Sequence, residues 1–172
     1  MSETGVPMAR GTDFAALLLG SHLRIVGRPL WPGEWAGEAE AAHWPYEQAP
    51  FGLLAHDTSD DPRFIYANRT AQRCFGYGEA EFAGLPSRLS AAPDGQQDRD
   101  AFVAAVTRRG FADGYRGRRV RKGGGLFWIE DVCMWDLVDA DGRKHGQAAV
   151  FRSWTDDTGG GRPAPADPRR GE

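Results

Sequence analysis

Three stretches of β-forming residues, separated by two short turn sequences, fill the last third of the chain and constrain the fold more than any other feature. The turns are Gly123-Gly124-Gly125 and Asp139-Ala140-Asp141-Gly142, and glycine and aspartate favour the tight connections of β-hairpins. They divide the segment into strands that we expect at residues 115–122, 126–138 and 145–154. Because strands joined by hairpins are antiparallel neighbours, this segment predicts an antiparallel sheet.

Two further strands and several helices are expected before this segment. Residues 51–57 and 63–67 are rich in β-formers and flank the turn sequence TSDDP, which predicts an early hairpin. Caps, terminating glycines and apolar spacing predict helices at 12–26, 34–43, 68–75, 79–83 and 94–109. The order predicts an α+β fold: a five-stranded antiparallel sheet with crossover helices on one face and an N-terminal helix. Such helices can enclose a ligand cavity against the sheet.

The composition is that of one globular domain, and it argues against several classes of protein. The chain has 172 residues, of which 41% are hydrophobic. Its net charge of -3, from 21 basic and 24 acidic side chains, argues against a general affinity for nucleic acid. The apolar run from Phe14 to Leu19 is too short to cross a bilayer. Cys74 and Cys133 have no metal-binding spacing. We therefore expect a cytoplasmic protein with reduced thiols and with neither a membrane nor a nucleic acid as partner.

The chain divides into four parts by composition. Residues 1–11 and 156–172 are polar and rich in glycine and proline, which predicts disorder. Residues 12–48 hold the N-terminal helix and a segment containing Trp31, Trp35 and Trp44. These tryptophans either pack the segment onto the core, which we favour, or form a partner surface. Residues 49–155 are expected to form the core.

The middle of the chain resembles a PAS domain. The resemblance rests on Phe64 to Ala71 (FIYANRTA), Phe75-Gly76-Tyr77 and Glu81 to Gly84 (EFAG), and on the closing hairpins up to Asp156-Asp157-Thr158. Light-sensing LOV domains of this superfamily carry a flavin-linking cysteine where this chain has Pro86-Ser87-Arg88. Haem-binding members place an axial histidine in the helix expected at 94–109, which contains none here. Neither a flavin adduct nor haem is therefore expected, and the cofactor stays unknown.

A closer resemblance, over residues 16–151, is to the MEKHLA domain. It is carried by Ala49-Pro50-Phe51, Tyr66-Ala67-Asn68, Leu85 to Ala91 (LPSRLSA), Tyr115-Arg116-Gly117, Val132 to Leu137 (VCMWDL) and Gly146 to Ala149 (GQAA). MEKHLA domains occur as stand-alone bacterial proteins and at the end of plant homeodomain–leucine zipper proteins. The resemblance implies a PAS-like sensory or interaction module. It does not imply DNA binding, because no homeodomain or zipper is present.

The strand at 126–138 supplies the main candidates for a ligand site. Its odd-numbered residues are apolar except Asp131, so this face is expected to line the cavity. An acid on an apolar face contacts a ligand, pairs with an arginine, or is turned outward by a bulge. Arg119 shares a face with Tyr115 and is expected to point inward. The full set of candidate ligand-binding residues is Tyr66, Asn68, Arg88, Arg119, Asp131, Cys133 and Trp135.

Three functions fit these observations. The first is a sensor that binds a small molecule in the cavity and signals to a partner protein or within a homodimer. The second is an interaction or dimerisation module whose cavity is filled by side chains. The third is a small enzyme, although the chain has no P-loop and no HExxH, GxSxG or GxGxxG motif. No catalytic residue or metal ligand is assigned.

Overall fold

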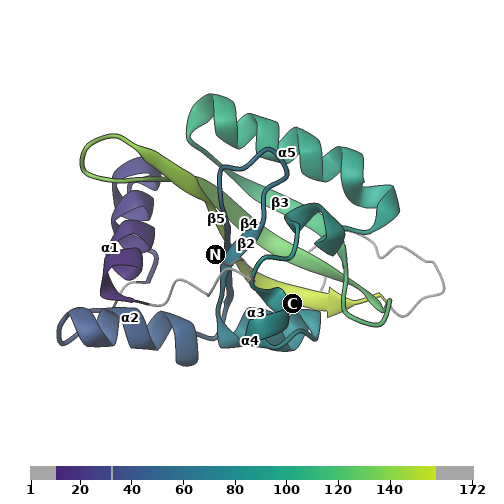
Figure 1. Ribbon diagram of the computed structural model, residues 1–172, viewed down its shortest axis with the longest axis horizontal. Helices are drawn as coiled ribbons and strands as arrows, with labels where there is room; N and C mark the ends of the chain where they lie inside the picture. The colour runs from purple at the N-terminus through teal and green to yellow at the C-terminus, as the bar shows by residue number, and fades with distance from the viewer. Residues whose placement is uncertain (1–10, 32, 158–172) are drawn as a thin grey trace, which may run out of the picture.

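Five antiparallel strands form one sheet at the centre of the molecule (Figure 1). The computed structural model describes residues 11–31 and 33–157. The strands lie in the order β2-β1-β5-β4-β3. Their bounds are β1 Gly52–His56, β2 Phe64–Ala67, β3 Phe111–Val120, β4 Leu126–Val138 and β5 Lys144–Asp156. The predicted α+β fold with a five-stranded antiparallel sheet is confirmed.

The two predicted hairpin turns connect the three longest strands. In the first, the amide of Gly124 donates to the carbonyl of Arg121 at 2.9 Å. In the second, the amide of Gly142 donates to the carbonyl of Asp139 at 2.9 Å. Gly142 has a φ of 85°, a conformation that side chains with a Cβ rarely adopt. Its lack of a side chain therefore permits this turn.

One face of the sheet, here called the inner face, is covered by the segment between β2 and β3. This segment holds α3 Arg69–Phe75, α4 Glu79–Phe82, two short 3₁₀ turns at Ser87–Ser90 (η2) and Pro93–Gly95 (η3), and α5 Gln96–Arg109 (Figure 1). Asn68 caps α3, because its Oδ1 accepts from the amide of Ala71 at 3.0 Å. Phe75, Phe82 and Phe127 pack together in the inner core and are fully buried.

The opposite, outer face of the sheet is covered by the N-terminal segment. Helix α1 (Thr12–Ser21) continues into a π-helical turn, η1 (His22–Val26), and α2 (Glu38–Glu47) follows. Trp135 of β4 is fully buried beneath this segment and donates its indole N–H to the carbonyl of Leu18 at 3.3 Å. The ring of His22 meets that indole edge-on at 4.6 Å. Each face of the sheet is therefore covered in part by helices of the same chain.

Two of the three N-terminal tryptophans surround an aromatic residue at the start of the core. The rings of Trp31 and Trp44 lie 4.8 Å apart. Both also contact Phe51, at 5.6 and 6.0 Å. Trp35 contacts Trp44 at 6.2 Å. These contacts fix the N-terminal segment against the core through ring packing.

The inward and outward alternation of β4 breaks at Asp131, which has a φ of 55°. Ile129 and Val132, three positions apart, both belong to the inner core. Beyond the break, Cys133 and Trp135 belong to the outer core. The expectation that all odd-numbered residues of β4 face the cavity is therefore wrong. A residue in the left-handed conformation shifts the two-residue period by one position and exchanges the faces.

The expected disordered termini fall largely outside the described residues. This holds for residues 1–10 and 158–172. Asp156, expected in the disordered tail, instead ends β5 opposite Phe127. Its carboxylate accepts from the Arg121 guanidinium at 3.0 Å.

Candidate functional site

A small, partly open cavity of about 50 Å³ lies between the inner face of the sheet and the segments η2 and α5. All five strands contribute to its wall. The lining residues are Leu54, Ala55, His56, Phe64, Ser87, Ser90, Arg99, Phe102, Val103, Tyr115, Arg119, Ile129, Val132, Met134, Gln147 and Ala149. Most of the wall is apolar, and a few polar groups converge on it, which is the usual composition of a ligand site.

Arg119 of β3 is the most deeply buried cation in this wall, with 8% of its surface exposed. Its guanidinium donates to the carbonyl of Arg118 at 3.2 Å and weakly to the Tyr115 hydroxyl at 3.5 Å. Within the described part of the chain, no carboxylate forms an ion pair with it. Burial lowers the pKa of Arg119, because the charged form loses its hydration.

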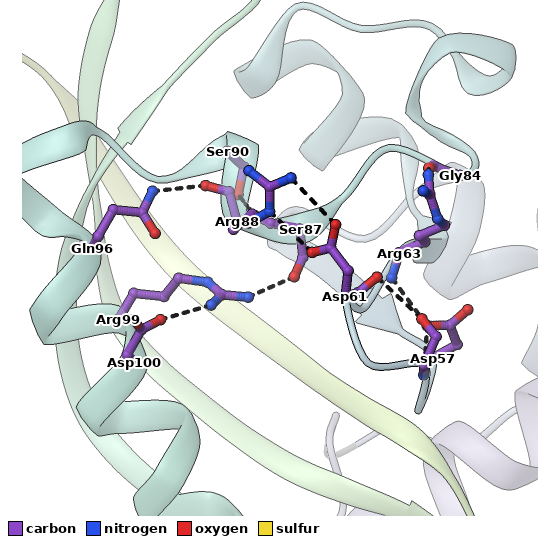
Figure 2. Close-up of polar contacts among 11 residues, drawn as sticks. Asp57, Asp61, Arg63, Gly84, Ser87, Arg88, Ser90, Gln96, Arg99 and Asp100 are labelled. Atoms are coloured by element: carbon purple, nitrogen blue, oxygen red, sulfur yellow. Dashed lines mark hydrogen bonds and ion pairs between the residues drawn. The ribbon is translucent and has the colours of Figure 1, made fainter.

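A second arginine, Arg99 of α5, enters the wall from the helical side. Its guanidinium donates to the Ser87 hydroxyl at 2.6 Å and to the Asp100 carboxylate at 3.0 Å. Figure 2 shows the Arg99 guanidinium between these two partners. Asp100 is exposed to solvent, so the charge of Arg99 is only partly neutralised.

A buried polar chain closes the cavity at the β1–β5 side. The Nε2 of His56 lies 3.1 Å from the Oε1 of Gln147. The amide nitrogen of Gln147 donates onward to Thr107 and to Asp136, at 3.2 and 3.1 Å. This pattern assigns the proton of the neutral imidazole to Nε2. Burial lowers the pKa of His56 from 6.5 to about 4, so this histidine is neutral at pH 7.

The apolar part of the wall is built by α5 and the central strands. The ring of Phe102 stacks on the ring of Tyr115 at 4.2 Å, with 10° between their planes. Ile129, Val132 and Met134 of β4 form the floor. Val132 and Met134 reach this floor because the break at Asp131 turns the even-numbered residues inward.

The structure places only one of the seven predicted site residues, Arg119, in the cavity wall. Tyr66 packs in the outer core against Phe14, at a ring distance of 5.1 Å. Asn68 is fully buried, and its amide donates to the carbonyls of Pro45 and Phe51, both at 2.9 Å. Its hydrogen bonds therefore hold chain segments together and leave no group aimed at the cavity.

Arg88 and Asp131 lie away from the cavity for different reasons. Arg88 turns out of η2 toward Asp61 and donates to both carboxylate oxygens, at 3.0 and 3.3 Å (Figure 2). Asp131 is exposed at the break in β4. Of the three readings given above for this acid, the structure matches the bulge that turns it outward.

Cys133 and Trp135 lie on the outer face, across the sheet from the cavity. Burial raises the pKa of the Cys133 thiol to about 11. The same holds for Cys74, in the inner core but not in the cavity wall. Both thiols are therefore protonated at neutral pH, which disfavours their reaction with oxidants.

Several wall residues were not among the predicted site residues, above all Arg99, His56 and Gln147. Arg99 had a readable signal: it precedes Phe102 and Val103 by three and four residues, so a helix places it on their face. Gln147 and His56 are opposite each other in the β1–β5 pairing. That pairing is not between chain neighbours, and no local pattern announces it.

Within the described residues, no group of three or more His, Cys, Asp or Glu side chains is arranged to hold a metal ion. Among the same residues, no helix is both long and apolar enough to span a bilayer.

The fold is similar to that of several solved PAS and light-oxygen-voltage domains. A PAS domain from Colwellia psychrerythraea shares 16% identity and a TM-score of 0.57, covering 71% of this chain and 98% of that one. The LOV domain of a blue-light activated histidine kinase from Erythrobacter litoralis shares 22% identity and a TM-score of 0.52, over 63% and 97% of the two chains. An RNA-binding light-oxygen-voltage receptor shares 22% identity and a TM-score of 0.57, over 74% and 36%.

A comparison with curated proteins gave no match. The model of the MEKHLA domain, in contrast, matches residues 12–156. This range includes the N-terminal helix, all five strands and every residue of the cavity wall. The chain therefore belongs to the MEKHLA domain family and has a PAS-like fold.

Proposed function

We propose that this protein is a sensory module that binds a small molecule in the cavity between the sheet and α5. The observation that carries the proposal is the cavity itself. Five strands and two helical segments direct side chains toward a space that they leave unfilled. Protein interiors are normally packed without voids larger than a water molecule. A lasting space lined by convergent polar groups is therefore a candidate for occupation.

The size of the cavity limits the ligand. The cavity has a volume of about 50 Å³. A cavity needs about 10–15 Å³ of the same kind of volume to hold one water molecule. The cavity therefore accommodates roughly three to five non-hydrogen atoms. Drug-sized ligands occupy sites of about 300–1,000 Å³. A metabolite of a few atoms fits the space as it stands, whereas a large cofactor does not.

A flavin in particular does not fit. LOV domains are among the similar structures, and one was studied with a flavin analogue. The cavity is far too small for an isoalloxazine ring, and neither cysteine lines it. This supports a chemistry different from that of the light sensors.

The strand β4 offers a route from the cavity to the rest of the molecule. Val132 and Met134 touch the cavity, whereas Cys133 and Trp135, between and beside them, pack against the N-terminal segment. A ligand that moves β4 therefore changes the surface on which α1 packs. Ligand binding would then shift the population of two arrangements of α1, which a cytoplasmic partner protein or a second copy can read.

The alternative, an interaction module without a ligand, has less support. Among the described residues, the exposed large hydrophobic side chains are Leu23, Leu89 and Trp154. They lie on three different elements, η1, η2 and β5. Interaction surfaces usually gather such residues in one patch. An enzymatic role has less support as well, because the hydroxyl of Ser87 binds Arg99 and that of Ser90 binds a backbone carbonyl, with no histidine base on either.

Filling the cavity tests the proposal. Ala149 is buried in the wall, and Ala149→Leu places extra carbon atoms in the space. Ala104→Leu, on the exposed side of α5, makes the same change outside it. Native mass spectrometry and thermal unfolding with a library of small metabolites should show bound mass or stabilisation in the wild type and in Ala104→Leu. Ala149→Leu should lose both, with an unchanged circular dichroism spectrum.

The opposite result would refute the proposal. If no library member adds mass to the wild type or stabilises it, the cavity is a packing defect. The same conclusion follows if Ala149→Leu responds to the library as the wild type does.

A further inference from the structure

The cavity wall carries positive charge without negative charge. Among the described residues, two arginines, Arg99 and Arg119, line the cavity, and no aspartate or glutamate does. The remaining titratable wall groups are the His56 imidazole and the Tyr115 hydroxyl, and the histidine is neutral at pH 7. The wall is therefore cationic and mostly apolar.

Among the residues that the structure describes, none supplies Arg119 with the counter-charge that a buried guanidinium normally has. More than nine-tenths of its surface is inaccessible to solvent. Its two hydrogen bonds go to neutral oxygens, at 3.2 and 3.5 Å, which leaves most of its five N–H donors without a protein acceptor. Buried charges in proteins are paired, because an isolated one is very costly to remove from water. This arrangement is expected when a ligand supplies the anion.

Arg99 adds a second positive charge near Arg119, so an anion in the cavity becomes more favourable. It lies close enough to Arg119 to repel it and to lower the Arg119 pKa further. Asp100 neutralises part of the Arg99 charge from the solvent side. More than one positive charge therefore lacks a full counter-charge, which fits an anionic ligand, and the small volume and apolar floor of the cavity favour a small anion with a hydrocarbon part.

We propose that the cavity binds a short organic monoanion, with its carboxylate on Arg119 and its hydrocarbon part against Ile129, Val132 and Met134. A planar carboxylate can accept two parallel N–H bonds from a guanidinium. The apolar floor contacts the hydrocarbon part, which inorganic anions lack. The assignment rests on the proposed function and specifies the ligand class.

Propionate is the probe, and propionamide, of nearly the same shape but neutral, is its matched control. Isothermal titration and thermal unfolding should detect propionate and not propionamide. A hundredfold excess over Kd should raise the unfolding midpoint by roughly 5–10 °C. Chloride and phosphate at equal ionic strength should give little effect. If both inorganic anions bind as well as propionate does, the proposed contact between the hydrocarbon part of the ligand and the apolar floor is wrong.

Two arginine variants identify the binding group. Arg119→Gln should weaken propionate binding roughly 10- to 150-fold, the range expected for losing charge-assisted hydrogen bonds. Arg108→Gln, at an exposed position in the last turn of α5, should leave the affinity unchanged. Equal affinity in the wild type and in Arg119→Gln would overturn the assignment.

Stability without ligand separates binding from a structural role. Arg119→Gln should unfold at the same temperature as the wild type or higher, because it removes an uncompensated buried charge. A clear drop in the midpoint without ligand would mean that Arg119 supports the fold, and the proposal would fail. If a neutral molecule stabilises the wild type in an Ala149-dependent manner and no carboxylate does, the ligand class is wrong and the sensor proposal stands. If nothing enters the cavity, both are wrong.

Discussion

Lowering the pH from 7 to 5 should destabilise this protein through His56. The imidazole is 4% exposed and bonded through Nε2 to Gln147. Burial holds its pKa at about 4 in the folded state, against an ordinary value of 6.5 in the unfolded chain. Between these two values the unfolded state binds more protons than the folded state. The contribution to stability is therefore complete above pH 6.5 and is lost as the pH falls toward 4.

The size of the effect follows from the two pKa values. Proton linkage gives a loss of about 2 kcal/mol at pH 5 and about 3 kcal/mol below pH 4. A domain of this kind is stable by about 5–15 kcal/mol in total, so this is a substantial fraction. His22, whose pKa is also lowered to about 4, makes the free energy of unfolding of the wild type fall more steeply with decreasing pH.

Urea unfolding at several pH values between 7 and 5 measures the slope, and a variant assigns it. His56→Gln keeps a donor for Gln147 but does not titrate, so its free energy of unfolding should fall less steeply with acid. The difference between the two slopes should amount to about 2 kcal/mol over this interval. His43→Gln, at an exposed position, serves as the control and should follow the wild type. Parallel curves for the wild type and His56→Gln would refute the reasoning, whatever their absolute offset.

Two further predictions concern β4. Trp135→Ala removes a fully buried indole beneath α1 and should lower the free energy of unfolding by about 3–5 kcal/mol in urea titrations; a loss below about 1 kcal/mol would contradict its core position. Asp131, at a φ of 55°, should tolerate glycine within about 0.5 kcal/mol, whereas Asp131→Val should cost about 1–2 kcal/mol. Equal stability of the two variants would show that the left-handed conformation is not maintained.

The elements of the fold were predictable because their signals are local. The glycine-rich turns fixed both late hairpins, and β4 was expected at its observed bounds, Leu126–Val138. Asn68 indicated the start of α3, because asparagine is a typical N-cap residue, and it caps this helix in the structure. Patterns of this kind span only a few residues and need no knowledge of the tertiary structure.

The candidate site was much less predictable, because one backbone angle decides which residues reach the cavity. Strict alternation places Cys133 and Trp135 on the same side as Ile129. The left-handed residue Asp131 exchanges the faces, so Val132 and Met134 take their place. Aspartate tolerates this conformation better than most residues, yet the sequence contains many aspartates that do not adopt it. The break is visible only once the strands on both sides are paired.

The outer face of the sheet has a consequence for where the folding unit begins. Its apolar side chains, among them Trp135, Leu137 and Val150, are fully or almost fully buried, and part of their cover is α1. A chain shortened to start at residue 49 would present this surface to water. A large exposed apolar surface favours association with other chains, so the shortened protein would self-associate or aggregate. A boundary at residue 49 therefore cuts through a hydrophobic core, and the smallest autonomous unit includes the N-terminal segment.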